Sequence, residues 1–308
     1  MKILSFGEII WDVYPDRAVI GGAPMNFAAH CAKCGAEGYI LSAVGNDKLG
    51  DDALSELDRL GVNTSLVNRN DYPTGRCNVT LDENRSPTYS LVSDVAYDHI
   101  EYSDALSDRI NGEKFDALCF GTLSQRNPVS ALTLRKLLDN CDIDEIFCDV
   151  NLRPNGYSEG SVRLCFERST TLKISDEEAP LLEAFDFMRG ISFSDARAAI
   201  CEIFKRYPNI KRILYTKGAE GSEVHTRDEQ ISIEPVKVDA VSSVGAGDSF
   251  GASWLTAMLG GASYGDAARL AAKVSAFVVS RTEAVPEYSL TRSVLSDANT
   301  IPEIISKN

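Results

Sequence analysis

The chain has 308 residues, 44% hydrophobic and 25% charged, a composition typical of a globular protein with one large α/β domain or two small ones. Its 45 acidic and 31 basic residues give a net charge of −14, which argues against nucleic-acid and anionic-membrane partners but leaves room for a small anion at a local site. No apolar run approaches the roughly 20 residues that span a bilayer, and Gly7, Glu8 and Asp12 interrupt the N-terminal run. We therefore expect a cytoplasmic protein without a signal peptide, whose eight cysteines are reduced thiols.

Apolar β-type runs alternate with amphipathic helical segments along most of the chain. Strands are predicted at 2–7, 39–44, 115–120, 145–150, 171–174 and 212–216, and helices at 25–34 and 50–60, each followed by a glycine. Such alternation predicts a mostly parallel sheet that is covered on both faces by helices.

One region departs from this alternation. Residues 75–92, GRCNVTLDENRSPTYSLV, contain two β-type runs on either side of the turn-rich segment 82–87, which predicts a hairpin. A further extended piece is expected at 13–20. Together these segments predict a small β-structure that projects from the α/β body.

Residues 243–250, SVGAGDSF, precede an apolar helix that is expected to begin near Asp248. The first amides of a helix lack intrahelical partners and carry partial positive charge, and Gly245 and Gly247 would let an anion come close to them. The segment therefore suits a phosphoryl group, with Asp248 placed to take a proton from an attacking hydroxyl. The Walker pattern is absent, since no lysine follows the second glycine. From these residues alone, an aspartate cap behind two turn glycines explains the segment equally well.

Several motifs occur in a fixed order along the chain. GEIIWD ends at Asp12, GGAPMN occupies 21–26, and GAGD follows at 245–248. With PTG at 73–75, FGTLSQR at 120–126 and DVNLRP at 149–154, the chain resembles the PfkB (ribokinase-like) family of sugar kinases over nearly its whole length, and its fructokinase branch most closely. The resemblance implies a ribokinase-like three-layer α/β/α fold with a small projecting β-sheet lid. It also implies a single kinase domain, 1–308, with lid segments at about 13–22 and 72–98.

The same resemblance implies roles for individual residues in an ATP- and Mg²⁺-dependent sugar kinase. Asp248 would be the general base, and Gly245, Ala246 and Gly247 would form the anion hole. The sugar-binding positions would be Asp12, Gly21, Gly22, Asn26, Asn151 and Arg153. A solvated loop acid is the alternative for Asp12, a helix cap for Asn26, and a surface ion pair for Arg153. Arg126 invites the same two interpretations as Arg153, a clamp on phosphate or sugar or an ordinary ion pair.

The nucleotide and metal positions follow in the same way. Thr216, Gly218 and Gly221 in YTKGAEGS match the nucleotide-binding segment, although a strand end followed by a turn would have the same sequence. In LKISDEEAP, Ser175 stands where many relatives have asparagine, and Glu178 is retained. The resemblance implies that Glu178 holds Mg²⁺ through water, with an ordinary acid at a helix N-terminus as the alternative.

Two departures concern a monovalent cation. Ser242 and Ser243 stand where relatives usually have Asp-Thr, and Glu283 stands where they have glycine. Potassium-activated members bind the ion between these two loops. We therefore expect weak or no activation of this chain by K⁺.

The most direct interpretation is a fructokinase that makes fructose 6-phosphate from fructose and ATP. The alternatives are a kinase for 2-keto-3-deoxygluconate, ribose or a nucleoside, and a sugar-binding sensor without catalysis. A dinucleotide oxidoreductase would need GxGxxG after the first strand, where GEIIWD stands instead. A sugar and ATP are the expected partners, and a second copy of the chain could cover the edge of the lid to make a homodimer.

Overall fold

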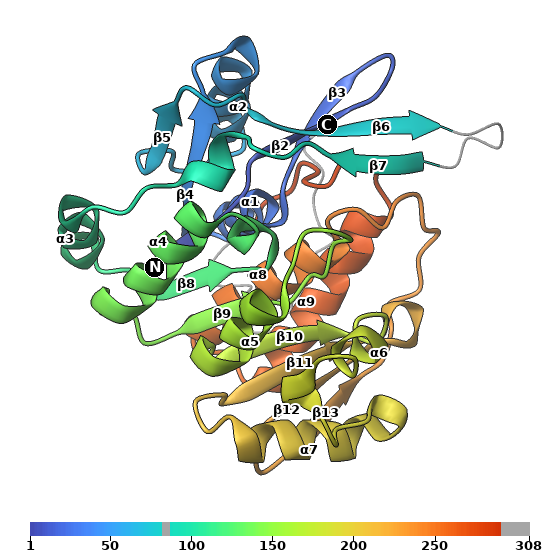
Figure 1. The fold of residues 1–308 in the computed structure, drawn as a ribbon. Helices are drawn as coiled ribbons and strands as arrows, with labels where there is room; N and C mark the ends of the chain where they lie inside the picture. Colours follow the sequence, from blue (N-terminus) through green and yellow to red (C-terminus); the bar gives the residue numbers. More distant parts are fainter. Residues whose placement is uncertain (82–86, 291–308) are drawn as a thin grey trace.

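The computed structural model describes residues 1–81 and 87–290, which form one large sheet, a smaller sheet and the helices around them (Figure 1). The large sheet has nine strands in the order β13-β12-β11-β10-β9-β8-β1-β4-β5. Only the pairs β11–β12 and β12–β13 are antiparallel. The bounds are β1 Lys2–Phe6, β4 Glu37–Gly45, β5 Val67–Asn70, β8 Ala117–Phe120, β9 Ile146–Asp149, β10 Thr171–Ser175, β11 Arg212–Thr216, β12 Ser222–His225 and β13 Gln230–Ile233.

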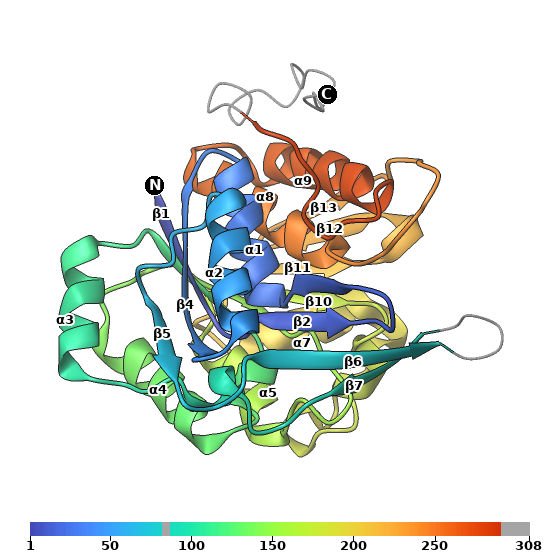
Figure 2. The same ribbon diagram turned by 90° about the horizontal axis from the view of Figure 1, so that it is seen from above.

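Helices cover both faces of this sheet (Figure 2). One face carries α3 Asp104–Glu113, α4 Pro128–Asn140, α5 Glu159–Arg168, the short α6 Ala179–Leu182 and α7 Ala196–Arg206. The other carries α1 Ala23–Lys33, α2 Lys48–Arg59, α8 Ala246–Leu259 and α9 Tyr264–Val279. The three-layer α/β/α prediction is therefore confirmed.

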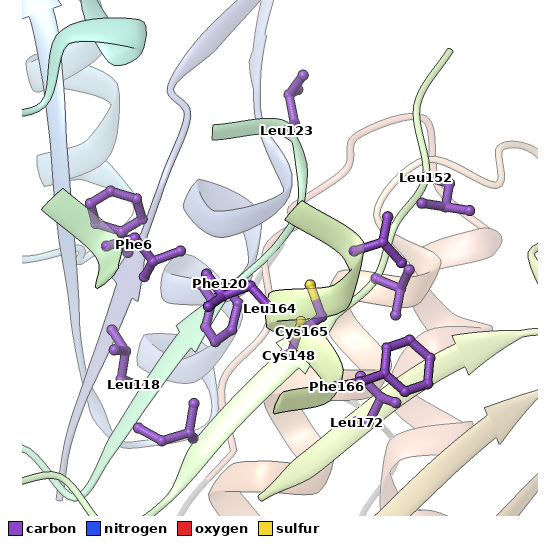
Figure 3. Close-up of a cluster of buried hydrophobic side chains, with 14 of the residues drawn as sticks. Phe6, Leu118, Phe120, Leu123, Cys148, Leu152, Leu164, Cys165, Phe166 and Leu172 are labelled. Atoms are coloured by element: carbon purple, nitrogen blue, oxygen red, sulfur yellow. The ribbon is translucent and has the colours of Figure 1, made fainter. Parts of the chain in front are cut away.

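The two core layers follow from the alternation of side chains along the buried strands. In β8, Leu118 and Phe120 point into the layer beneath α4 and α5, part of which Figure 3 shows, whereas Ala117 and Cys119 point toward α1 and α8. In β10 the same alternation places Lys173 on the α8 side of the sheet, between two apolar neighbours that face the other layer.

The smaller sheet has four strands in the order β3-β2-β6-β7 and projects from the body (Figure 1). Its strands are β2 Ile10–Val13, β3 Ala18–Gly21, β6 Gly75–Leu81 and β7 Pro87–Leu91. The predicted lid segments, 13–22 and 72–98, contain β3, β6 and β7, whereas β2 lies almost wholly before the first of them. Most of the turn predicted at 82–87 lies outside the described residues.

Most predicted elements match the structure to within one to three residues at each end. The helix expected near Asp248 begins at Ala246, because Gly245 adopts a left-handed conformation (φ 81°) that ends the preceding loop. All eight cysteines are unpaired. In the described part of the chain, no helix is both long and apolar enough to cross a bilayer.

Candidate active site

The candidate site lies where the carboxyl ends of neighbouring parallel strands meet, the usual place for a ligand crevice in an open α/β sheet. A cavity there is lined by Glu8 after β1, Thr122 after β8, Asp149 and Asn151 at the end of β9, and Asp248 in α8. The strand order explains this grouping, since β1, β8 and β9 are adjacent in the sheet. Residues from distant parts of the sequence therefore meet in one crevice.

The N-terminus of α8 lies at this crevice, which Asp248 lines, and no side chain of residues 1–81 and 87–290 caps it. The amide of Ala246 donates to the carbonyl of Ser243 at 3.2 Å. The amides of Gly247 and Asp248 have no such acceptor among the described residues, and both groups carry the partial positive charge of a helix start. The helix thus offers two unused donors beside a carboxylate.

Asp248 is held by Asn26 from α1, whose Nδ2 donates to Oδ2 of Asp248 at 2.7 Å. Removal from water and the negative charge of Asp149 raise the pKa of Asp248 to about 6, against the lowering effect of the Asn26 hydrogen bond. The Oδ1 atom of Asn26 is buried and has no partner within residues 1–81 and 87–290. Asn26 therefore orients the carboxylate and has one buried acceptor that no described residue uses.

A buried ion pair supports the same helix start. Lys173 Nζ lies 3.0 and 2.9 Å from the two carboxylate oxygens of Asp149, and the two residues are neighbours in the β9–β10 register. A Cβ added to Gly247 would lie 3.0 Å from Lys173 Nζ, so the glycine leaves the ammonium room beside the helix N-terminus. Burial lowers the pKa of Lys173, but Asp149 and Glu178 outweigh it and hold the pKa above its ordinary value. The ammonium is therefore a fixed positive charge next to the two unused amides.

Sequence reasoning did not assign roles to Lys173, Asp149 or Glu8. A lysine within the apolar run LKIS was an available signal, because a strand buried on both faces admits a charge only with a partner. Glu8 is buried after β1, and burial together with the charge of Asp248 raises its pKa to about 7. Its signal was an acid directly after a strand in GEIIWD.

The predicted sugar positions at the N-terminal end lie at the junction between the lid and the body. Asp12 belongs to β2 of the lid sheet rather than to a loop, because it pairs with Val19 in β3 and Cys77 in β6. Burial raises the pKa of Asp12. A Cβ on Gly21 would make only an ordinary 3.7 Å contact with Asp12 Oδ2, whereas on Gly22 it would lie 2.5 Å from the carbonyl oxygen of Glu8. Gly22 is therefore required by packing, independently of any ligand.

The DVNLRP segment places two predicted residues at the crevice in different ways. Asn151 lies at the end of β9 with a positive φ of 41°, which is uncommon for a residue with a side chain, and it lines the cavity beside Asp248. Arg153 is exposed, and its positive charge partly opposes the rise that burial causes in the pKa of Asp12 and of Asp248. Its guanidinium therefore lies close to the crevice.

Arg126 has a different environment. Its guanidinium makes two 2.8 Å hydrogen bonds to the buried carboxylate of Asp98 and a third, of 2.7 Å, to the carbonyl of Val92. These contacts tie the segment after β7 to the FGTLSQR turn. They use three of the five N–H donors of the guanidinium, as expected for the ion-pair interpretation.

The predicted nucleotide and metal residues lie farther along the same sheet edge. Thr216 ends β11, and its carbonyl accepts from the amide of Asp176 beyond the end of β10. Gly218 and Gly221 have positive φ values of 50° and 93°, and a Cβ on Gly221 would lie 2.2 Å from the carbonyl of Ile233. Because β11, β10, β9, β8 and β1 are adjacent in this order, the predicted nucleotide residues after β11 and the predicted site residues after β9 lie along the same edge of the sheet.

Glu178 is buried and already accepts three hydrogen bonds. Its Oε1 accepts from the amide of Leu152 at 2.8 Å, and its Oε2 accepts from the amide and hydroxyl of Ser175 at 2.8 and 3.0 Å. A carboxylate has about four acceptor positions, so roughly one remains for a water molecule. Glu178 therefore fits a water-mediated role toward a metal and also fixes the DVNLRP segment.

A comparison with protein families matches residues 7–289 to the pfkB family carbohydrate kinases. The chain belongs to this family. It is 28% identical over 295 residues to an ATP-dependent 6-phosphofructokinase of Thermoanaerobacterium thermosaccharolyticum, an alignment that covers 89% of this chain and 87% of the relative. It is 26% identical over 268 residues to a fructokinase of Escherichia coli, with 83% and 84% covered.

Solved structures confirm the ribokinase-like fold. A putative ribokinase II from E. coli, in complex with ATP and Mg²⁺, superposes with a TM-score of 0.77 at 20% sequence identity, covering 92% of this chain and 94% of that one. The predicted family and enzyme class are therefore confirmed, and this protein is a sugar kinase.

Proposed function

We propose that this kinase transfers the γ-phosphoryl group of MgATP to the primary hydroxyl of fructose, with Asp248 as general base. The observation that carries this proposal is the start of α8, where a carboxylate held at 2.7 Å by Asn26 adjoins the unused amides of Gly247 and Asp248. A substrate hydroxyl there would give its proton to Asp248 as its oxygen bonds to phosphorus. The bond from phosphorus to the ADP oxygen breaks in the same transfer.

The surroundings of Asp248 suit this reaction because phosphoryl transfer depends chiefly on positioning and electrostatic stabilisation. The two amides would bind oxygens of the transferring group, and the Lys173 ammonium would add a fixed positive charge beside Gly247. Gly245 and Ala246 would shape the phosphoryl cradle, by which we mean the start of α8 at residues 245–248. The amide of Ala246 is already used by the preceding turn.

ATP would lie over the carboxyl ends of β10 and β11, along Thr216, Gly218 and Gly221. Bound Mg²⁺ would neutralise charge on the phosphate oxygens, and Glu178 would hold one of its waters through its remaining acceptor position. The solved relative with ATP and Mg²⁺ supports this choice of nucleotide and metal.

The sugar would lie between the lid and the body. Asp12 and the free Oδ1 of Asn26 would accept hydrogen bonds from its hydroxyls, and Asn151 would contact it from the end of β9. Fructose is favoured by the fructokinase motifs of this sequence and by the similarity to the fructokinase of E. coli.

A second candidate acceptor is fructose 6-phosphate. Arg153 is exposed beside the crevice, and within the described residues no carboxylate lies within 4.0 Å of its guanidinium to form an ion pair, so it could bind a phosphate on the substrate. The similarity to a 6-phosphofructokinase gives this candidate its weight.

The lid also offers an interface for a second copy of the chain. Its edge strands β3 and β7 carry the exposed side chains of Val19 and Tyr89, 37% and 50% accessible. Pairing of two lids would cover these edges and make a homodimer. Sedimentation of the purified chain tests this, because a monomer at all concentrations would contradict it.

The proposed reaction is tested by ADP formation with a panel of acceptors: fructose, fructose 6-phosphate, 2-keto-3-deoxygluconate, ribose and a nucleoside. We expect fructose to give the highest kcat/KM of these acceptors. The product formed from it should be fructose 6-phosphate. Preference for fructose 6-phosphate that is lost in Arg153→Met would favour the second candidate. Sugar binding by calorimetry without ADP formation on any acceptor would contradict catalysis and indicate a sensor.

A further inference from the structure

The start of α8 is covered by the segment 283–288, which we call the strap. The carbonyl oxygen of Ala284 in the strap lies so close to Gly245 that a Cβ on the glycine would be 2.4 Å from it. Gly245 is the N-cap of α8. The strap therefore packs closely against the residue that sets the direction of the first amides of the helix. The position of this one carbonyl therefore bears directly on the phosphoryl cradle.

A single buried histidine fixes that carbonyl. Nε2 of His30 lies 3.0 Å from the carbonyl oxygen of Ala284, and Nδ1 lies 2.7 Å from the hydroxyl of Tyr288 at the other end of the strap. Both side chains are buried. A carbonyl can only accept, so Nε2 carries the proton and donates it, and Nδ1 accepts from the tyrosine hydroxyl. Burial lowers the pKa of His30 to about 4, which keeps this neutral tautomer at neutral pH.

His30 lies one turn after Asn26 on α1, so the two side chains share a face of that helix. Asn26 holds the carboxylate of Asp248, and His30 holds the strap against Gly245. One helix face thus fixes both the base and the glycine cap of the same cradle. Neither contact involves the lid.

We propose that His30 is a positioning residue for phosphoryl transfer: by fixing the Ala284 carbonyl against Gly245, it sets the amides of Gly247 and Asp248 in the direction that the transferring group requires. This inference rests on the proposed function. Loss of the His30 contact would let the strap move and turn the first helical amides, while Asp12 and the other sugar contacts stay in place. A small displacement of catalytic groups can lower a rate by up to about a hundredfold.

The test compares His30→Leu, which removes both hydrogen bonds, with His30→Gln, which keeps an N–H that can donate to the Ala284 carbonyl. We expect His30→Leu to lower kcat by about tenfold or more and to change the dissociation constant of the sugar by less than about twofold. His30→Gln should recover most of the lost kcat. Tyr288→Phe removes only the hydroxyl and should give an intermediate loss of kcat. This variant still tests the inference if His30→Leu does not fold.

A second readout separates this inference from the proposed function. Hydrogen exchange of the peptide covering 241–250 needs no substrate, and it should be faster in His30→Leu and Tyr288→Phe than in the native chain or His30→Gln. Unchanged exchange in all variants, or equal kcat per folded molecule in His30→Leu and the native chain, would overturn the positioning role. A native chain that turns over no sugar would instead overturn the proposed function, and the exchange result would still decide the role of His30 at the helix start.

Discussion

The packed sheet edge and the lid are built by different kinds of contact. At the sheet edge, side chains far apart in sequence hold one another, as Asn26 holds Asp248 and Lys173 holds Asp149. The lid is joined mainly by backbone pairing among its own four strands, and side chains such as Tyr89 are half exposed. Under the proposed function, this difference predicts that single residues at the edge control the chemical step, whereas the lid controls how well the sugar is held.

The largest effect is expected from Asp248→Asn. The amide oxygen of asparagine can still accept from Asn26, so the site should keep its shape and bind fructose nearly normally. Loss of the base should lower kcat by at least about a hundredfold, measured by ADP formation at saturating sugar. Asp266→Asn changes an acid in the first turn of the next helix and serves as the matched control. Near-native kcat in Asp248→Asn would remove Asp248 from its role.

The pH profile of the native kinase should report the same base. Because the pKa of Asp248 is raised to about 6 and only the carboxylate accepts a proton, kcat/KM should fall about tenfold per unit as pH drops below 6, and level off above it. Glu8, with a pKa of about 7, is mostly protonated at pH 6, so the uncharged Glu8→Gln should keep this acid limb. A profile that stays flat from about pH 5 to 7 would contradict the assignment.

A lid substitution should act on binding more than on turnover. Asp12→Asn removes the charge of a predicted sugar acceptor in β2 and should raise the KM for fructose about tenfold, with a smaller change in kcat. Asp16→Asn, at an exposed acid in the turn between β2 and β3, is the control and should leave both constants unchanged. A loss confined to kcat in Asp12→Asn would break the division between lid and edge.

The smallest effect is expected from exchanging the monovalent cation. The hydroxyl of Ser242 accepts from the amide of Val244 at 3.2 Å, and Glu283 is exposed in the strap. Ser242 lacks the negative charge of the aspartate at this position in potassium-activated relatives, and Glu283 lacks the flexibility of their glycine. Rates in sodium, potassium and tetramethylammonium buffers should agree within about twofold, and a several-fold stimulation by potassium would show that the two loops still bind the ion.

Periodicity predicted the fold well because the buried strands and amphipathic helices carry strong local patterns. The start of α8 could also be predicted to within two residues, because turn glycines and an acid are common at a helix N-terminus and an apolar helical pattern follows GAGD. The lid strand β2 was partly missed because it has only four residues, two buried and then two half-buried, and this short pattern without alternation is a weak signal next to the strong strand β1. Arg126 illustrates the limit for single charges, because only the fold reveals that Asp98 is its partner.

The contacts that complete the candidate site were beyond sequence reasoning. His30 and Ala284 are 254 positions apart, and nothing local to either residue predicts that they meet. Lys173 and Asp149 become partners only through the register of two parallel strands. Such pairs depend on the order of strands in the sheet, which the alternation of elements does not specify.

The Lys173–Asp149 pair also restricts how this protein can change over time. Replacing either member alone leaves the other charge buried without its partner, at a cost of about 3–5 kcal/mol, a large share of the stability of an ordinary domain. A single mutation at either codon would therefore be removed by selection, although two uncharged residues together could pack well. Descendants that keep the proposed phosphoryl transfer should keep both residues, because the Lys173 ammonium also serves the transferring group, and only a descendant without that activity should lose both.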